Sequence, residues 1–124
     1  MNPFIKTFVA AGAIAHRRLV AFTDVDGELV QATASSDRIA GILDMPGGAV
    51  TGQRIDVILF GPAEVEFGGT VKPGEFITSD ADGKAVAAAP AADANSHVAG
   101  RALANAVSGD IARTMINPGL IQGA

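Results

Sequence analysis

Side chains of the types that perform catalysis are scarce in this chain. It contains no cysteine, which removes thiolate nucleophiles, disulfide bonds and cysteine-ligated metals together. The two histidines, His16 and His97, lack the spacings that place two imidazoles on one metal ion. Asp93 and Ser96 precede His97, but no Gly-x-Ser-x-Gly turn presents a serine as a nucleophile. We therefore expect a protein that is not an enzyme and that has no catalytic, metal or cofactor site.

Two segments with alternating carboxylates, 24–28 and 80–84, superficially resemble the start of a calcium-binding loop. The position that supplies a bidentate glutamate in such loops is Ser35 in the first case and Ala91 in the second. Weak calcium binding is therefore a minor alternative. The same segments contain Asp-Gly pairs, which favour tight hairpin turns because glycine readily adopts a positive φ. We predict hairpins at 26–27 and 82–83.

Lys84, at the tip of the second predicted hairpin, suggests a different class of function. Biotinyl and lipoyl carrier domains are small two-fold β-barrels with a modified lysine at such a tip. Segment 69–74, Gly-Thr-Val-Lys-Pro-Gly, is similar to a sequence motif of that family. The Met-Lys-Met tip of biotin carriers is missing, and the similarity is short. A carrier domain with Lys84 as the modified residue remains the alternative function.

Charge and hydropathy exclude two other classes of partner. The net charge is −4, and the nine Lys and Arg residues are scattered, so no basic stripe is available for nucleic acid. The longest apolar run, residues 8–15, is far shorter than the ~20 residues that a membrane-spanning helix needs. This run loosely resembles a signal peptide, but its residues 13–15 match the interior segment 70–72, as a signal peptide would have no reason to do, so we do not expect one. We expect no nucleic-acid and no membrane partner.

Turn-forming residues punctuate the chain at short intervals, which favours many short strands over long helices. Segments 54–60 and 63–67 alternate apolar with polar residues or are rich in β-branched residues, which predicts strands. Gly61-Pro62 between them is interpreted as a turn. Strands are also expected at 85–88 and 97–103, with a loop at 89–95. The alanine-rich composition of 85–107 would otherwise favour a helix, but Pro90 and Gly100 interrupt it.

An internal duplication with a period of about 57 residues organises these strands. The segment that begins at Gly12 matches the one that begins at Gly69, and both continue into an Asp-Gly hairpin. Segments 39–41 and 52–57 are matched by 98–100 and 109–114. Small residues are plentiful, and about a third of the chain is Ala or Gly. Large side chains for the core are correspondingly few, which favours burial of surface against other copies or a partner.

The expected fold is therefore all-β, a small β-barrel or sandwich-like domain of residues 1–124 built from two similar halves, 10–66 and 67–124. The segment 1–9 has no convincing counterpart. It forms either an arm that reaches a capsid or a neighbouring subunit, or the first strand of the barrel. The candidate contact residues in this segment are Asn2, Pro3, Phe4, Ile5 and Phe8.

With this layout, the sequence resembles the bacteriophage head decoration proteins, also called capsid cement proteins. The resemblance rests on an ordered series of turn-and-strand segments: 21–33, 37–42, 52–57, 63–71, 73–74, 78–86 and 109–111. It covers most of residues 12–117, and no single motif is diagnostic.

The resemblance implies a structural virion protein on the outer surface of a phage head, made in the host bacterial cytoplasm. It implies a homo-oligomer, commonly a trimer, that binds the major capsid protein and stabilises the shell by bridging capsid subunits. It supplies no catalytic residues. The capsid symmetry axis that is occupied, and whether the oligomer forms before attachment, stay open.

Overall fold

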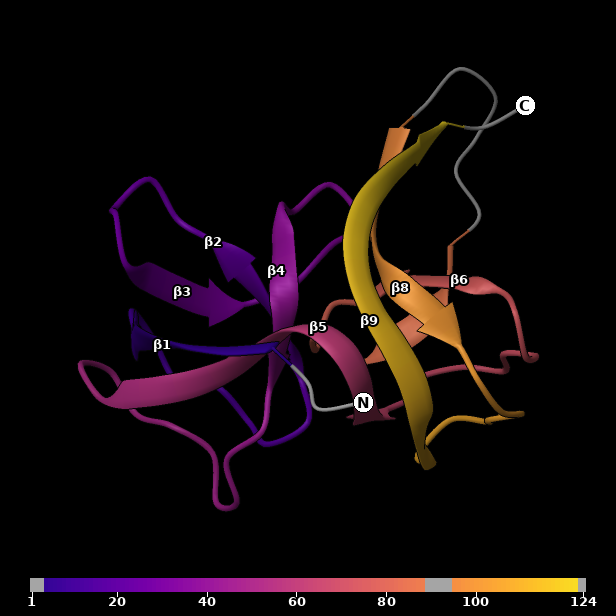
Figure 1. Cartoon of the computed structure of the whole chain (residues 1–124), viewed down its shortest axis with the longest axis horizontal. Coiled ribbons are helices and arrows are strands. Elements are labelled where there is room, and N and C mark those ends of the chain that lie inside the picture. Colours follow the sequence, from indigo (N-terminus) through magenta and orange to yellow (C-terminus); the bar gives the residue numbers. More distant parts are fainter. Residues whose placement is uncertain (1–3, 89–94, 123–124) are drawn as a thin grey trace.

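The computed structural model describes residues 4–88 and 95–122, and every regular element within these ranges is a β-strand (Figure 1). The strands are β1 (Phe4–Ala10), β2 (Leu19–Phe22), β3 (Glu28–Gln31), β4 (Ile39–Leu43), β5 (Arg54–Glu66), β6 (Phe76–Ser79), β7 (Ala85–Ala87), β8 (Asn95–Ala102) and β9 (Ile111–Gln122). In the same ranges no helix is long and apolar enough to cross a membrane. The all-β fold is therefore confirmed.

The first five strands form a closed barrel. Their order is β1-β3-β2-β4-β5, and β1 also pairs with β5, which closes the ring. The pair β1–β3 is parallel and the others are antiparallel. Closure removes the exposed strand edges of an open sheet.

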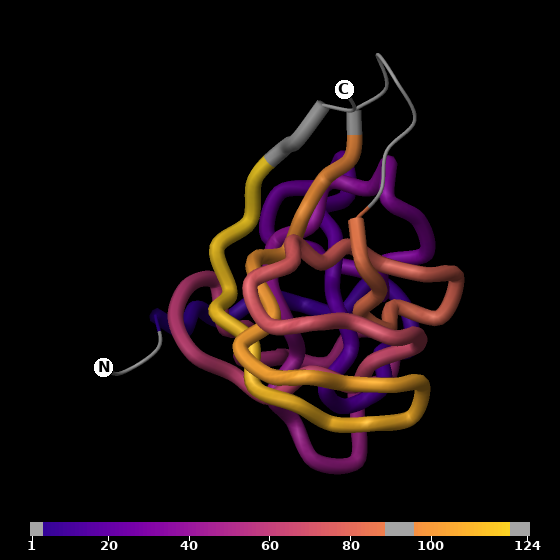
Figure 2. The backbone as a smooth tube through the Cα atoms, turned by 90° about the vertical axis from the view of Figure 1, so that its right-hand side faces the viewer, coloured from indigo at the N-terminus to yellow at the C-terminus, as the bar shows by residue number. Residues whose placement is uncertain are grey.

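The second half of β5 continues into a second ring, in the order β5-β9-β8-β6-β7. A parallel bridge between Phe67 and Ala85 connects the end of β5 to β7. The amide of Gly68 also donates to the carbonyl of Ala85 at 2.8 Å. Figure 2 shows the second ring, orange to yellow, in front of the indigo first ring. Each half of the duplication thus forms its own small barrel, and the two barrels share β5.

Strand register confirms the duplication. Val20 pairs with Gly41 in the first barrel, and Ile77 pairs with Gly100 in the second. The isolated bridge from Ile14 to Ala49 recurs 57 residues later as the bridge from Val71 to Ala106. Gly27 and Gly83, in the two predicted hairpins, have φ of 81° and 75°. The match of segments 12–20 and 69–77 therefore reflects a real structural repeat.

Register also identifies the counterpart of β1, which the sequence does not reveal. Phe8 pairs with Ile55, and Val65 pairs with Ala112, each 57 residues further along. Strand β1 is thus equivalent to 61–67, and the repeats extend back to residues 4 and 61 rather than beginning at 10 and 67. Residues 4–10 form the first strand of the first barrel.

The predicted turn at Gly61-Pro62 is wrong, because β5 continues through these residues as one bent strand (Figure 1). Gly61 has φ of 114°, and Phe4 and Ile5 flank a register shift opposite the bend. A positive φ and an irregular register allow the strand to turn from one barrel into the other without leaving the sheet.

Equivalent positions in the two barrel interiors carry different side chains. Phe67 is fully buried in the second barrel, where the first barrel has Ala10. Leucines of the first barrel are replaced by alanines in the second: Leu29 by Ala85 and Leu43 by Ala102. The phenyl ring of Phe67 therefore fills space in the second barrel that Leu29 and Leu43 fill in the first. Both interiors are close-packed in this way.

Candidate functional site

Both histidines take part in hydrogen bonds, His16 through its imidazole and His97 through its backbone. Nδ1 of His16 accepts a hydrogen bond from the backbone amide of Met45 at 2.9 Å. The backbone amide of His97 donates to the carbonyl of Ser35 at 2.8 Å. Within residues 4–88 and 95–122, no group of three or more His, Cys, Asp or Glu could hold a metal ion.

In both predicted hairpins a side-chain oxygen stabilises the turn, and in the second hairpin it belongs to one of the alternating carboxylates, Asp80. Oδ1 of Asp80 accepts hydrogen bonds from the amides of Asp82 and Lys84, at 2.8 and 2.9 Å. In the first hairpin Thr23 Oγ1 takes the equivalent role by accepting from the amide of Val25 at 3.0 Å. These contacts are those of turns in which a side chain satisfies nearby backbone groups.

Lys84 is held between the two barrels rather than presented at a free tip. Its Nζ lies 3.5 Å from a carboxylate oxygen of Glu66. The hairpin tip is docked on the first barrel, where the carbonyl of Gly83 accepts from the amide of Leu19 at 2.8 Å. The carbonyl of Asp82 accepts from Arg18 at 2.8 Å. A carrier lysine must swing freely between partners, and this geometry does not support that alternative.

The candidate contact residues at the N-terminus fall into three groups. Asn2 and Pro3 lie outside the described residues. Phe4 and Ile5 are exposed, with 60% and 47% of their surface accessible. Phe8 is partly buried and packs against the core of the first barrel. Phe8 therefore contributes to the barrel, while Phe4 and Ile5 are available to a partner.

Phe60 joins this exposed group, although it was not among the predicted contact residues. Phe60 pairs with Phe4 across β1 and β5, and it is 43% exposed. Side chains alternate along a strand, so Phe60 lies on the same outer side of β5 as the exposed Asp56, opposite the buried Val57. We call Phe4, Ile5 and Phe60 the N-terminal apolar patch. Exposed aromatic residues at neighbouring positions are typical of interaction surfaces.

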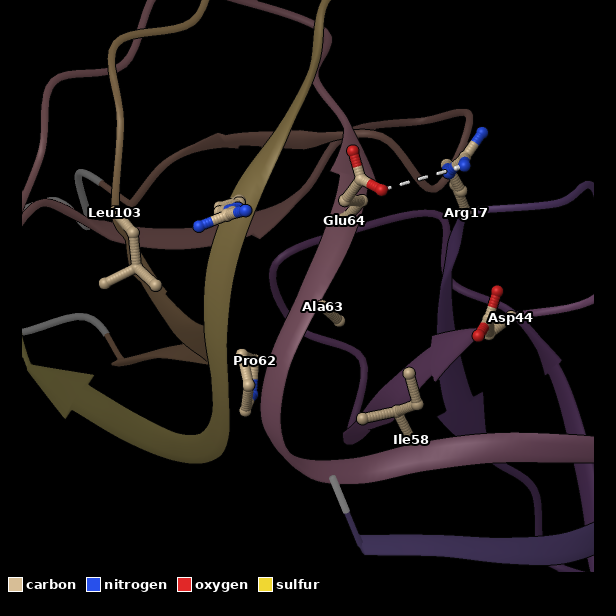
Figure 3. A pocket seen from close by; sticks show the side chains of 8 residues that line it. Arg17, Asp44, Ile58, Pro62, Ala63, Glu64 and Leu103 are labelled. Carbon is tan, nitrogen blue, oxygen red and sulfur yellow. Dashed lines mark ion pairs between the residues drawn. The ribbon is translucent and has the colours of Figure 1, made fainter. Parts of the chain in front are cut away.

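A groove of about 480 Å³ lies where β5 bends between the barrels (Figure 3). Figure 3 shows Glu64 on β5 between Arg17 on one side and Leu103 on the other. Nη2 of Arg17 lies 4.0 Å from Oε1 of Glu64; the Arg17 side chain is partly exposed and that of Glu64 is exposed. The lining combines charged and apolar side chains: Arg17, Asp44, Ile58, Pro62, Ala63, Glu64, Leu103 and Arg113. Such mixed lining suits a polypeptide surface better than a small substrate.

Arg17 has a positive φ of 62°, and its counterpart in the second repeat is Gly74 with φ of 88°. Both residues donate their amide to the equivalent strand, Arg17 to Leu43 and Gly74 to Ala102. The turn therefore requires a left-handed conformation, which costs an arginine about 1 kcal/mol relative to glycine. In the first repeat the strained residue is Arg17, which also lines the groove.

Comparisons with known proteins bear on the fold alone. No protein-family model matches the chain, and no curated protein matches it. A search of solved structures finds a match to the head fiber gp8.5 N base of bacteriophage phi29, with a TM-score of 0.71 and 20% sequence identity. The match covers 94% of this chain and 95% of that one. The fold is similar to that of a phage head fiber base.

Proposed function

We propose that this chain is a structural protein of a phage head that binds the outside of the capsid as a homo-oligomer, expected to be a trimer. It stabilises the shell by bridging neighbouring major capsid subunits. The observation that supports this most is the similarity of both barrels, over nearly the full length of both chains, to a protein described as a head fiber base.

Two features of the molecule are consistent with a binding role. Its grooves combine apolar and charged walls, and the N-terminal apolar patch exposes two phenylalanines and an isoleucine. The decoration function also needs no single high-affinity site. Many modest contacts repeated over a capsid lattice produce strong attachment by avidity.

The N-terminal apolar patch is the proposed contact surface, facing either the capsid or a neighbouring copy. Phe4 and Ile5 are accessible, whereas the adjacent part of β1 is paired on both sides, with β5 and β3. Deletion of residues 1–9 would remove a strand that closes the first barrel. Point substitutions at the patch therefore test the contact without opening the barrel.

The test uses phage heads prepared without this protein. Purified wild-type chain should co-sediment with the heads, and binding should saturate at a fixed ratio to the major capsid protein. Ile5→Glu should weaken attachment at least tenfold, whereas Val107→Glu, at an exposed apolar residue outside the patch, should not. Failure of the wild-type chain to bind would contradict the proposed function. Equal binding by Ile5→Glu would contradict only the assignment of the patch.

A further inference from the structure

The sheet formed by β6, β8 and β9 carries a mixed set of apolar and cationic side chains on its outer side. Strand pairing places Phe76 beside Arg101, and Arg101 beside Met115. Leu103, directly after β8, lies beside Arg113, and the amide of Leu103 donates to the carbonyl of Arg113 at 3.0 Å. We call Phe76, Arg101, Leu103, Arg113 and Met115 the arginine face.

These five side chains point away from the interior of the second barrel. Paired residues share one side of a sheet, and neighbours along a strand alternate between its two sides. Ala102 and Thr114, which lie between the outward positions, are fully buried. The two arginines and Leu103 are exposed, and Phe76 is 37% exposed. The two arginines therefore occupy one diagonal of a square, and Leu103 and Met115 occupy the other.

The equivalent face of the first repeat is covered by the second barrel. Leu19, Ile42 and Ile58 are buried there in one apolar cluster with second-repeat side chains. Arg101, the counterpart of Ile42, is exposed instead. The second repeat thus leaves open the face that the first repeat buries, and carries a cation at its centre.

The arginine face is positive on a chain whose net charge is −4. Within residues 4–88 and 95–122, Arg17, Arg18 and Arg38 form ion pairs with carboxylates, whereas neither arginine of this face does. Arg113 also reverses the charge of its first-repeat counterpart, Asp56. The face is therefore complementary to a partner that supplies carboxylates.

Arg101 is held in place beside a groove. Its guanidinium lies 4.6 Å from the centre of the Phe76 ring, which favours a cation–π contact and limits its motion. A groove of about 320 Å³ opens at this point, lined by Phe76, Gly100, Arg101, Met115 and Asn117. An apolar side chain of a partner can enter the groove while a neighbouring carboxylate binds the guanidinium in a bidentate manner.

The spacing of the two arginines suits an extended polypeptide. Diagonal neighbours on paired strands are about 7–8 Å apart, and alternate residues of an extended chain are about 6.4–6.8 Å apart on one side. We infer that the arginine face binds an extended segment of another protein that has carboxylates at alternate positions. One carboxylate pairs with Arg101 and the next with Arg113, and an apolar residue two positions before the first enters the groove.

Carboxylates of the chain itself limit what else can bind. Glu64 pairs with Arg113 across β5 and β9, and Glu75 precedes Phe76. Both glutamates are exposed, so the continuous phosphates of a nucleic acid would meet them on either side of the face. Glu64 also attracts Arg113, which makes Arg101 the stronger of the two contacts.

The probe is a blocked synthetic peptide, Leu-Ser-Glu-Thr-Glu-Ser, titrated into isotopically labelled protein and followed by nuclear magnetic resonance. It should bind with a Kd on the order of 1 mM and shift the backbone amides of residues 76, 100–103 and 113–117. A peptide of the same composition with adjacent glutamates should bind at least threefold more weakly, because adjacent side chains point to opposite sides. A version with glutamine in place of glutamate should not bind.

Charge reversal provides the matched test. The double variant Arg101→Glu with Arg113→Glu should lose the glutamate peptide and bind a lysine version of it instead. Arg54→Glu is the control, because this exposed arginine of the first barrel undergoes the same change of charge outside the face. Arg101→Gln should weaken binding more than Arg113→Gln. Circular dichroism shows whether each variant is folded, and the glutamine variants replace any charge-reversed variant that is not.

Absence of shifts at about 10 mM peptide would overturn the inference, as would shifts confined to other surfaces or tighter binding of oligothymidylate. Shifts of the same amides with protein concentration alone would assign the face to a second copy and overturn it too. The inference goes beyond the proposed function, since the partner segment need not belong to a capsid. No capsid is used, and none of these variants changes the N-terminal apolar patch, so the two proposals fail independently.

Discussion

Thr114 occupies, in the second barrel, the position that Val57 occupies in the first. The two residues pair with Ala63 and Lys6, respectively, at matching points of the repeat. Thr114 is fully buried, and its Oγ1 has no hydrogen-bond partner. A buried hydroxyl without a partner costs about 1–3 kcal/mol. The repeat itself therefore shows which side chain would fit better.

We predict that Thr114→Val raises the free energy of unfolding by about 1 kcal/mol, because it removes the unsatisfied hydroxyl and keeps the shape of the side chain. Urea denaturation followed by circular dichroism measures the change. The reciprocal variant Val57→Thr buries a new hydroxyl and should lower stability by a similar amount. A Thr114→Val protein that is less stable than wild type would show that the hydroxyl is satisfied.

At the scale of strands, two equivalent glycines allow close approach of neighbouring backbones. Gly41 in β4 pairs with Val20, and Gly100 in β8 pairs with Ile77. A Cβ at Gly41 would collide with the carbonyl oxygen of Ile58, and one at Gly100 with that of Met115. The match of 39–41 with 98–100 in the sequence thus marks a packing requirement.

Gly41→Ala should lower the free energy of unfolding by about 1–3 kcal/mol, since β4 and β5 must separate to admit the methyl group. Gly12→Ala is the matched control, because nothing lies within 4 Å of a Cβ there and its φ is not positive. Thermal unfolding of both variants tests this. Equal melting temperatures would mean that β4 shifts without cost.

The sequence predicts those elements whose signals are local. The Asp-Gly pairs predict the hairpins at 26–27 and 82–83. The repeat is recognisable in the sequence where the two halves have similar residues. The sequence does not reveal that β1 is equivalent to 61–67, because the two segments have no identical residue at any matched position. Pro62 suggests a turn, yet a bent strand tolerates proline at an irregular point of its ladder. The outward position of Phe60 agrees with the alternation of side chains along 54–60, in which Phe60 shares a side of the strand with Asp56.

At the scale of the molecule, contacts between the repeats hold the barrels together. Arg18, with little exposed surface, bonds both Glu66 and the backbone of Asp82 in the other repeat. Gln31 also donates to the Asp82 carbonyl, at 2.9 Å. These bonds fix the β6–β7 hairpin on the first barrel and thereby set the shape of the surface that a partner would meet.

Arg18→Ala should therefore cost about 1–2 kcal/mol of stability, because partly buried charge-assisted hydrogen bonds are lost. Arg38→Ala is the control, since its ion pair with Asp24 is highly exposed and contributes little. Chemical denaturation of both variants provides the comparison. If Arg38→Ala lowered the free energy of unfolding as much as Arg18→Ala does, the role assigned to the Arg18 contacts between the barrels would be contradicted.

Attachment to a phage head is the central claim, and imaging tests it most directly. Electron cryomicroscopy of heads assembled with and without this chain should show additional density on the outside of the capsid only when the chain is present. Two small barrels should fit that density, and it should bridge neighbouring major capsid subunits. Identical capsid surfaces in the two samples, at saturating concentrations of the chain, would contradict the claim.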